Sequence, residues 1–99
     1  MMGLQIGSQN ITADGVVGTS GKPVRVFEFI VRSTSDGGAA VAVYNGTSTG
    51  GTKYDDLNGT TSLTVRIPYV GGLLFPGGCY LDIDANTSYV TVIYTQEAN

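Results

Sequence analysis

Apolar and polar residues alternate along most of this chain, in short segments separated by glycine, asparagine and aspartate. Alternation with a period of two buries one side of a segment and exposes the other, as β-strands do. No window repeats apolar residues at the three- and four-residue spacing of an amphipathic helix. The pattern predicts strands over residues 24–32, 39–44, 52–57, 60–67, 71–78, 79–84 and 88–95.

The number and spacing of these segments favour an all-β fold. About seven or eight short strands at this spacing predict a single small antiparallel β-sandwich, Greek-key or jelly-roll-like in its connectivity. An antiparallel barrel is the alternative. A chain of 99 residues builds one domain with a thin core.

Strand parity predicts which side chains form that core. In residues 24–32, Phe27, Phe29 and Val31 fall on one face, and we expect that face to be buried. Applied to the other segments, the same reasoning gives the full predicted core: Phe27, Phe29, Val41, Val43, Leu63, Val65, Leu81, Ile83 and Val92. Asn58-Gly59 predicts a tight hairpin turn, and Pro68 is expected to end the strand before it.

The first 21 residues differ from the rest because their apolar residues are isolated. We therefore divide the chain into residues 1–21, an N-terminal arm or edge strand, and residues 22–99, the β-sandwich domain. An extended arm can add a strand to a neighbour's sheet edge. On that hypothesis the arm would meet a partner through Leu4, Ile6, Ile11, Val16 and Val17.

Leu73, Leu74 and Phe75 form an apolar run without alternation. One face of this run can pack inside the sandwich, and the other would then meet a neighbouring subunit. These three residues complete the predicted partner or oligomer interface.

Composition restricts the chemistry further. Lys and Arg number 5 and Asp and Glu number 8, which gives a formal net charge of −3 and argues against nucleic-acid binding. The chain has no histidine and one cysteine, so imidazole catalysis and an internal disulfide are excluded. We expect no enzyme activity, no cofactor and no membrane association. The opening residues lack the pattern of a signal peptide, so a soluble protein made in the cytoplasm is expected.

Three motifs invite a chemical interpretation. Residues 82–86 (DIDAN) resemble the start of a calcium loop, but Thr87 and Ile93 stand where that loop needs glycine and glutamate. Adjacent Asp55 and Asp56 should point to opposite faces of a strand and so form no acid pair. Cys79 alternates with apolar residues, which predicts a buried thiol and no metal site.

Two stretches carry a resemblance to a known group of proteins. Residues 43–52 (VYNGTSTGGT) and 74–90 (LFPGGCYLDIDANTSYV) resemble small all-β virion proteins of tailed bacteriophages, notably those of cyanobacterial and marine hosts. The resemblance covers about residues 24–95 and consists of turn motifs, so it carries over no catalytic residue.

The resemblance implies a capsid decoration (cement) protein that binds the major capsid protein on the outer shell, with the virion surface as its location. It also implies a homo-oligomer, expected to be a trimer. The alternatives are a tail or connector component, and a recognition module for a host glycan or protein.

Overall fold

The computed structural model describes residues 6–97, and all of its regular elements are strands. These are β1 (Ile6–Ile11), β2 (Gly15–Val17), β3 (Val24–Ser33), β4 (Ala40–Asn45), β5 (Thr52–Asn58), β6 (Thr64–Phe75), β7 (Cys79–Ile83) and β8 (Thr87–Gln96). The strand segments predicted from alternation are confirmed, except that the two segments predicted at 60–67 and 71–78 belong to one long strand, β6. Residues 6–97 therefore contain no helix that could span a membrane.

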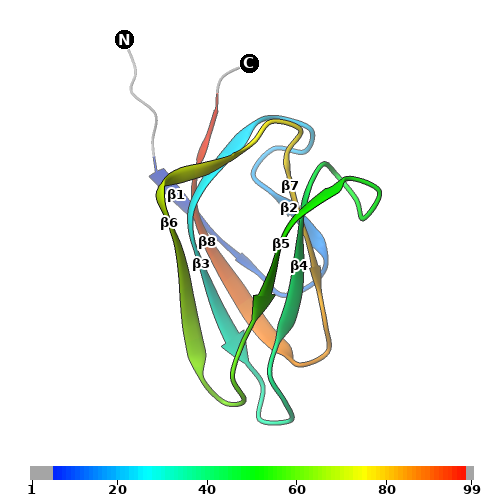
Figure 1. Ribbon diagram of the computed structural model, residues 1–99, viewed down its shortest axis with the longest axis vertical. Helices are drawn as coiled ribbons and strands as arrows, with labels where there is room; N and C mark the ends of the chain where they lie inside the picture. The colour runs from blue at the N-terminus through cyan, green and yellow to red at the C-terminus, as the bar shows by residue number, and fades with distance from the viewer. Residues whose placement is uncertain (1–5, 98–99) are drawn as a thin grey trace.

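The strands form two antiparallel four-stranded sheets packed face to face (Figure 1). We call them sheet A, with the order β1-β8-β3-β6, and sheet B, with the order β2-β7-β4-β5. Only β4 and β5 are neighbours both in sequence and in a sheet, and every other connection crosses from one sheet to the other. This winding is the jelly roll, so the predicted β-sandwich is confirmed.

Residues 6–17 contribute edge strands to both sheets. β1 pairs with β8 along its whole length, from Ile6 opposite Thr95 to Ile11 opposite Val90. β2 pairs with β7, with Val17 opposite Cys79. Of the two alternatives for residues 1–21, the described part therefore adopts the edge-strand arrangement.

The core lies between the two sheets and is built from inward residues of all eight strands. Its members are Ile11, Val17, Val24, Val26, Phe29, Val31, Ala39, Val41, Val43, Leu57, Phe75, Cys79, Leu81, Val90 and Val92. Phe29 and Phe75 are the largest fully buried side chains. Phe29, Val41, Val43, Leu81 and Val92 confirm part of the predicted core.

A β-bulge at Phe27 corrects the predicted face of β3. The register of β3 against both β6 and β8 shifts between Val26 and Glu28, which leaves Phe27 as the extra residue. A bulge reverses the parity of the side chains that follow it. Val24 and Val26 therefore point inward before the bulge, and Phe29 and Val31 point inward after it, while Phe27 is only half-buried.

The strand β6 bends sharply opposite this bulge (Figure 1). In the β3–β6 pairing, Val26 lies opposite Leu73 and Glu28 lies opposite Pro68, so residues 69–72 leave the regular ladder. Gly71 and Gly72 have φ angles of 79° and 85°, a region that side-chain-bearing residues rarely adopt. A Cβ atom at Gly72 would also meet the Arg25 and Phe27 side chains at 2.6–3.0 Å.

The predictions at Pro68 and Asn58-Gly59 were wrong. Pro68 does not end its strand, because β6 is an edge strand and tolerates a residue without an N–H group. Asn58-Gly59 does not close a hairpin, since β5 and β6 belong to different sheets. The Gly59 N–H donates to the Ala39 carbonyl over 2.8 Å, and a Cβ there would collide with the Ser33 hydroxyl.

Three other predicted core residues are less buried than expected. Leu63 is 54% exposed because it lies in the connection between the sheets, before β6 begins. Val65 and Ile83 are half-buried, since Val65 is the second residue of β6 and Ile83 is the last residue of β7.

Truncation of Phe29 tests the assignment of faces in β3. The ring is fully buried and meets the Tyr69 ring edge-to-face, with centroids 5.9 Å apart. We expect Phe29→Ala to lower the free energy of unfolding by about 3–5 kcal/mol, measured by chemical denaturation. Phe27→Ala is the matched control, with an expected loss of about 1–2 kcal/mol because that ring is partly exposed. Equal losses from the two variants would contradict the bulge.

Candidate functional site

The outer face of sheet B gathers carboxylates and tyrosines, and we call it the aspartate face. Alternation in β7 sends Leu81 into the core and Tyr80 and Asp82 outward. Ala42 of β4 lies opposite both Asp82 of β7 and Asp56 of β5, so the two carboxylates flank a small residue. The aspartate face comprises Asp14, Ala40, Ala42, Tyr44, Lys53, Asp56, Asn58, Tyr80, Asp82 and Asp84.

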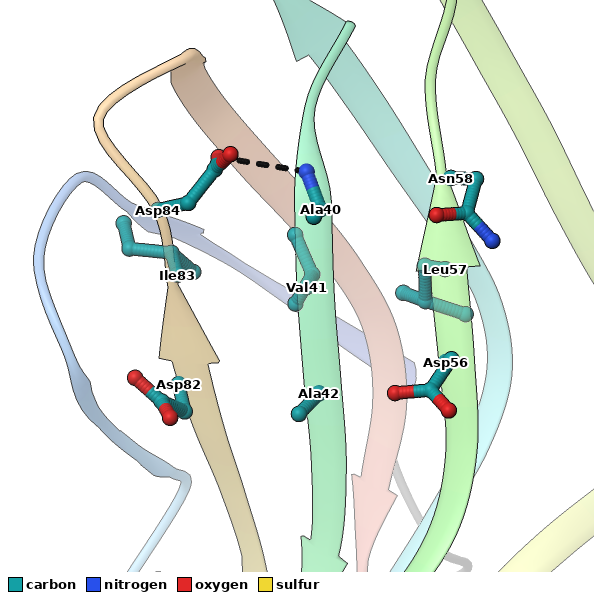
Figure 2. A pocket seen from close by; sticks show the side chains of 9 residues that line it. All are labelled: Ala40, Val41, Ala42, Asp56, Leu57, Asn58, Asp82, Ile83 and Asp84. Atoms are coloured by element: carbon teal, nitrogen blue, oxygen red, sulfur yellow. Dashed lines mark hydrogen bonds between the residues drawn. The ribbon is translucent and has the colours of Figure 1, made fainter.

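The small side chains of Ala40 and Ala42 leave a shallow depression in this face, with a volume of about 360 Å³. Figure 2 shows Asp82, Ala42 and Asp56 at one level on three adjacent strands. The depression is lined by Ala40, Val41, Ala42, Asp56, Leu57, Asn58, Asp82, Ile83 and Asp84. It is open and polar, and its shape suits surface contact rather than enclosure of a small molecule.

Hydrogen bonds engage some of these carboxylates in the fold. Asp84 Oδ1 accepts from the Ala40 N–H over 3.1 Å and from the Thr87 hydroxyl over 2.7 Å (Figure 2 shows the first bond). Asp56 pairs with Lys53 at 3.2 Å, and this hydrogen bond raises the pKa of the lysine. Within residues 6–97, no group of three or more His, Cys, Asp or Glu residues is placed to hold a metal ion.

Tyr44 and Tyr80 lie side by side beyond the depression. They are cross-strand partners, with ring centroids 6.5 Å apart and planes inclined by 57°. The Lys53 ammonium group lies 6.0 Å from the centroid of the Tyr44 ring. Desolvation, followed by the charges of Asp14 and Asp82, raises the pKa of Tyr80. The pair is an aromatic surface bordered by carboxylates.

The outer face of sheet A has the opposite chemistry, and we call it the arginine face. No other element of residues 6–97 covers it (Figure 1). Register places Ile6, Thr95, Arg25 and Leu74 in one row across the sheet, and Asn10, Thr91, Ile30 and Arg66 in another. The face comprises these residues together with Ser8, Glu28, Arg32, Thr64, Pro68, Tyr89 and Ile93.

The arginines of this face differ in their partners. Arg66 forms a bidentate pair with Glu28, at 2.7 and 3.0 Å, and this hydrogen bonding lowers the pKa of Glu28. Arg25 pairs with Glu97 at 3.5 Å. Within residues 6–97, the Arg32 guanidinium donates one side-chain hydrogen bond, to the Thr64 hydroxyl at 3.4 Å, and no carboxylate lies within ion-pair distance of it.

The residues predicted as an interface are distributed between the surface and the core. Ile6 and Leu74 are exposed and share a row of the arginine face, while Val16 and Leu73 are half-buried. Ile11, Val17 and Phe75 lie in the chain's own core, where sandwich residues already cover them. Leu4 lies outside the described residues.

Two surface features escaped sequence reasoning. Val70 is fully exposed at the bend of β6, between the two segments that the sequence predicted as separate strands. The separation of arginines from aspartates was also missed. Alternation within each strand shows that these charged residues point outward. Which of them share a face depends on the pairing of strands that are distant in the sequence.

A hydrogen bond between the sheets connects two edge strands. The Tyr69 hydroxyl in β6 donates to Asp55 Oδ2 in β5 over 2.6 Å. Asp55 points inward because its strand partner is the buried Val43, whereas Asp56 points outward, as predicted. Desolvation, followed by the hydrogen bond to Asp55, raises the pKa of Tyr69.

Cys79 is fully buried, as predicted. Burial raises the pKa of its thiol to about 12, so it remains protonated at neutral pH. A protonated, covered thiol is a poor nucleophile and a poor metal ligand.

Comparison with known proteins adds no relative: no family model, no curated protein and no solved structure matches this chain.

Removing the Tyr69 hydroxyl tests the bond between the sheets. We expect Tyr69→Phe to lower the free energy of unfolding by about 1–3 kcal/mol, because the half-buried Asp55 carboxylate loses its donor. Asp56→Asn is the control, with an expected change below about 1 kcal/mol for an exposed ion pair. Chemical denaturation of both variants gives the comparison.

The pH dependence provides an independent check. Folding favours the neutral form of Tyr69, so its contribution is complete below the ordinary tyrosine pKa of 10.0 and is lost as the pH rises above it. The fall in stability above pH 10 should be shallower in Tyr69→Phe than in the natural protein. Identical pH profiles would contradict the role assigned to this hydroxyl.

Proposed function

We propose that this protein is a non-enzymatic structural component of a bacteriophage virion, a capsid decoration protein that binds the major capsid protein on the outer shell. The resemblance of residues 43–52 and 74–90 to small phage virion proteins supports this function. Jelly rolls occur in viral capsid proteins and in lectins, which is a fold-level analogy and carries less weight.

The observation that carries the proposal is the uncovered arginine face. A four-stranded sheet in a small sandwich has one side in the core and the other in solvent. Here the solvent side presents Ile6, Ile30, Pro68, Leu74 and Ile93 among arginines. Apolar side chains interspersed with arginine are typical of protein–protein interfaces.

Association with further copies, as a homotrimer, is the second part of the proposal. Ile6 is 68% exposed and Leu74 is 38% exposed, and both lie in the terminal row of the arginine face. Burial of these two side chains would favour the oligomer. Binding of the folded form to other copies or to a capsid lattice would also stabilise a domain whose own core is thin.

A glycan-recognition module is the second candidate, favoured by a different surface. Tyr44 and Tyr80 provide adjacent aromatic rings, and Asp56 and Asp82 provide hydrogen-bond acceptors beside the depression. Aromatic rings that have a polar tip suit ligands with both apolar and hydroxyl surfaces.

Purified virions of the phage that encodes this chain test the decoration function. Quantitative mass spectrometry should find the protein in a fixed ratio to the major capsid protein, and a density map should place it on the outer shell. Its absence from the particles would overturn the proposal. If the density map instead places the protein in the tail or connector, with the copy number of such a component, the tail or connector alternative is correct.

Thermal melting with added sugars tests the second candidate. A glycan-binding protein should show a saturable rise in melting temperature with one class of sugar, and Tyr80→Ala should abolish the rise. Tyr89→Ala is the control, because Tyr89 lies on the opposite sheet. If no sugar in a broad panel shifts the melting temperature, this candidate fails.

A further inference from the structure

The two outer faces of the sandwich carry charge of opposite sign. Every arginine of the chain (Arg25, Arg32 and Arg66) lies on the arginine face, accompanied by Glu28 and Glu97. The aspartate face holds Asp56, Asp82 and Asp84, with Asp14 beside them, and its cation is Lys53. A protein with a net charge of −3 therefore presents one face with a positive excess.

The positive excess centres on Arg32, at the end of the face away from Ile6 and Leu74. Arg32 lies between Tyr89 of β8 and Thr64 of β6 in one row. The adjacent row holds Ile30 and Arg66. Arg32 thus has no carboxylate partner among the described residues and lies beside a tyrosine, and arginine and tyrosine are both enriched among the central residues of interfaces.

The charge distribution argues against a second copy as the occupant of this region. Two copies brought together through their Arg32 ends would oppose cation to cation, which disfavours that contact. An arginine face and the aspartate face of another copy attract, but they lie on opposite sides of the sandwich (Figure 1). Such head-to-tail contacts would continue as an open stack and would not close into a trimer.

We infer that the Arg32 end of the arginine face docks on an acidic, partly apolar surface of the major capsid protein, so that the aspartate face points away from the shell. This inference rests on the proposed function and adds the orientation of the bound protein. Arg32 and Arg66 would pair with carboxylates of the capsid, and Ile30 and Tyr89 would contact apolar side chains between them. The outward aspartate face would keep the decorated particle soluble through its negative charge.

Charge reversal on each face tests the orientation. The assay is co-sedimentation of the purified protein with capsids of the same phage that lack it. We expect Arg32→Glu to weaken binding about tenfold or more, and Arg66→Glu to do the same, because each would oppose an acidic surface. Arg32→Lys should retain most of the affinity, and Asp82→Lys, on the opposite face, should bind as the natural protein does.

Melting temperatures of all variants show whether they fold. We expect small changes, because Arg66 is exposed and the half-buried Arg32 and Asp82 lie on the outer faces of the sheets and not in the core. Binding that weakens in Asp82→Lys and is unchanged in Arg32→Glu and Arg66→Glu would overturn the inference while leaving the decoration function intact. The inference would also be overturned if light scattering showed that Arg32→Glu or Arg66→Glu dissociates an oligomer of this chain. Failure of the natural protein to bind the capsids would instead overturn the proposed function itself.

Discussion

The packing of the two sheets depends on the bulge at Phe27 in β3. β3 is an interior strand of sheet A, paired on both sides, and its inward side chains change parity at this residue. Without the extra residue, the strand would bury either Val24 and Val26 or Phe29 and Val31, but not both pairs. The glycines at the bend of β6 accommodate the same discontinuity, because Gly72 leaves room for Arg25 and Phe27. One irregularity thus allows a ten-residue strand to contribute buried side chains along its whole length.

Most strands could be predicted because alternation is a local property. β4, β5, β7 and β8 lie within one residue of the segments predicted for them. The hairpin at Asn58-Gly59 and the strand end at Pro68 failed for another reason, which is that their outcome depends on which strands become neighbours. Asn-Gly favours a tight turn in any local context, but in a jelly roll this connection crosses between sheets, and Gly59 is required there for close packing.

The candidate surfaces could likewise be predicted only in part, because side-chain direction within a strand is local and strand pairing is not. The sequence places Tyr80 and Asp82 on one side of β7, yet the face also needs Asp56 and Tyr44, which only the register of β4 with β5 and β7 brings alongside. The arginine face likewise combines residues from four strands that are far apart in the sequence. The net charge of −3 does not reveal that arginines and aspartates lie on different faces, because it is a sum over the whole chain.

The edges of the two sheets help to direct association toward the faces. In β5, Asp55 points inward and a bulge at Tyr54 breaks the regular edge, and in β6 the edge is interrupted by Pro68 and the glycine bend. Inward charges, bulges and prolines are all devices that discourage pairing between sheet edges. β2 has only three residues, which offers a partner strand few hydrogen bonds. β1 is longer, but the Gln9 side chain donates to the Val16 carbonyl and accepts from the Gly18 N–H, and so holds β1 to the C-terminal end of β2. With its edges limited in these ways, the sandwich has two outer faces as its largest remaining surfaces, and their opposite charges are what would orient the protein on the partner that we propose.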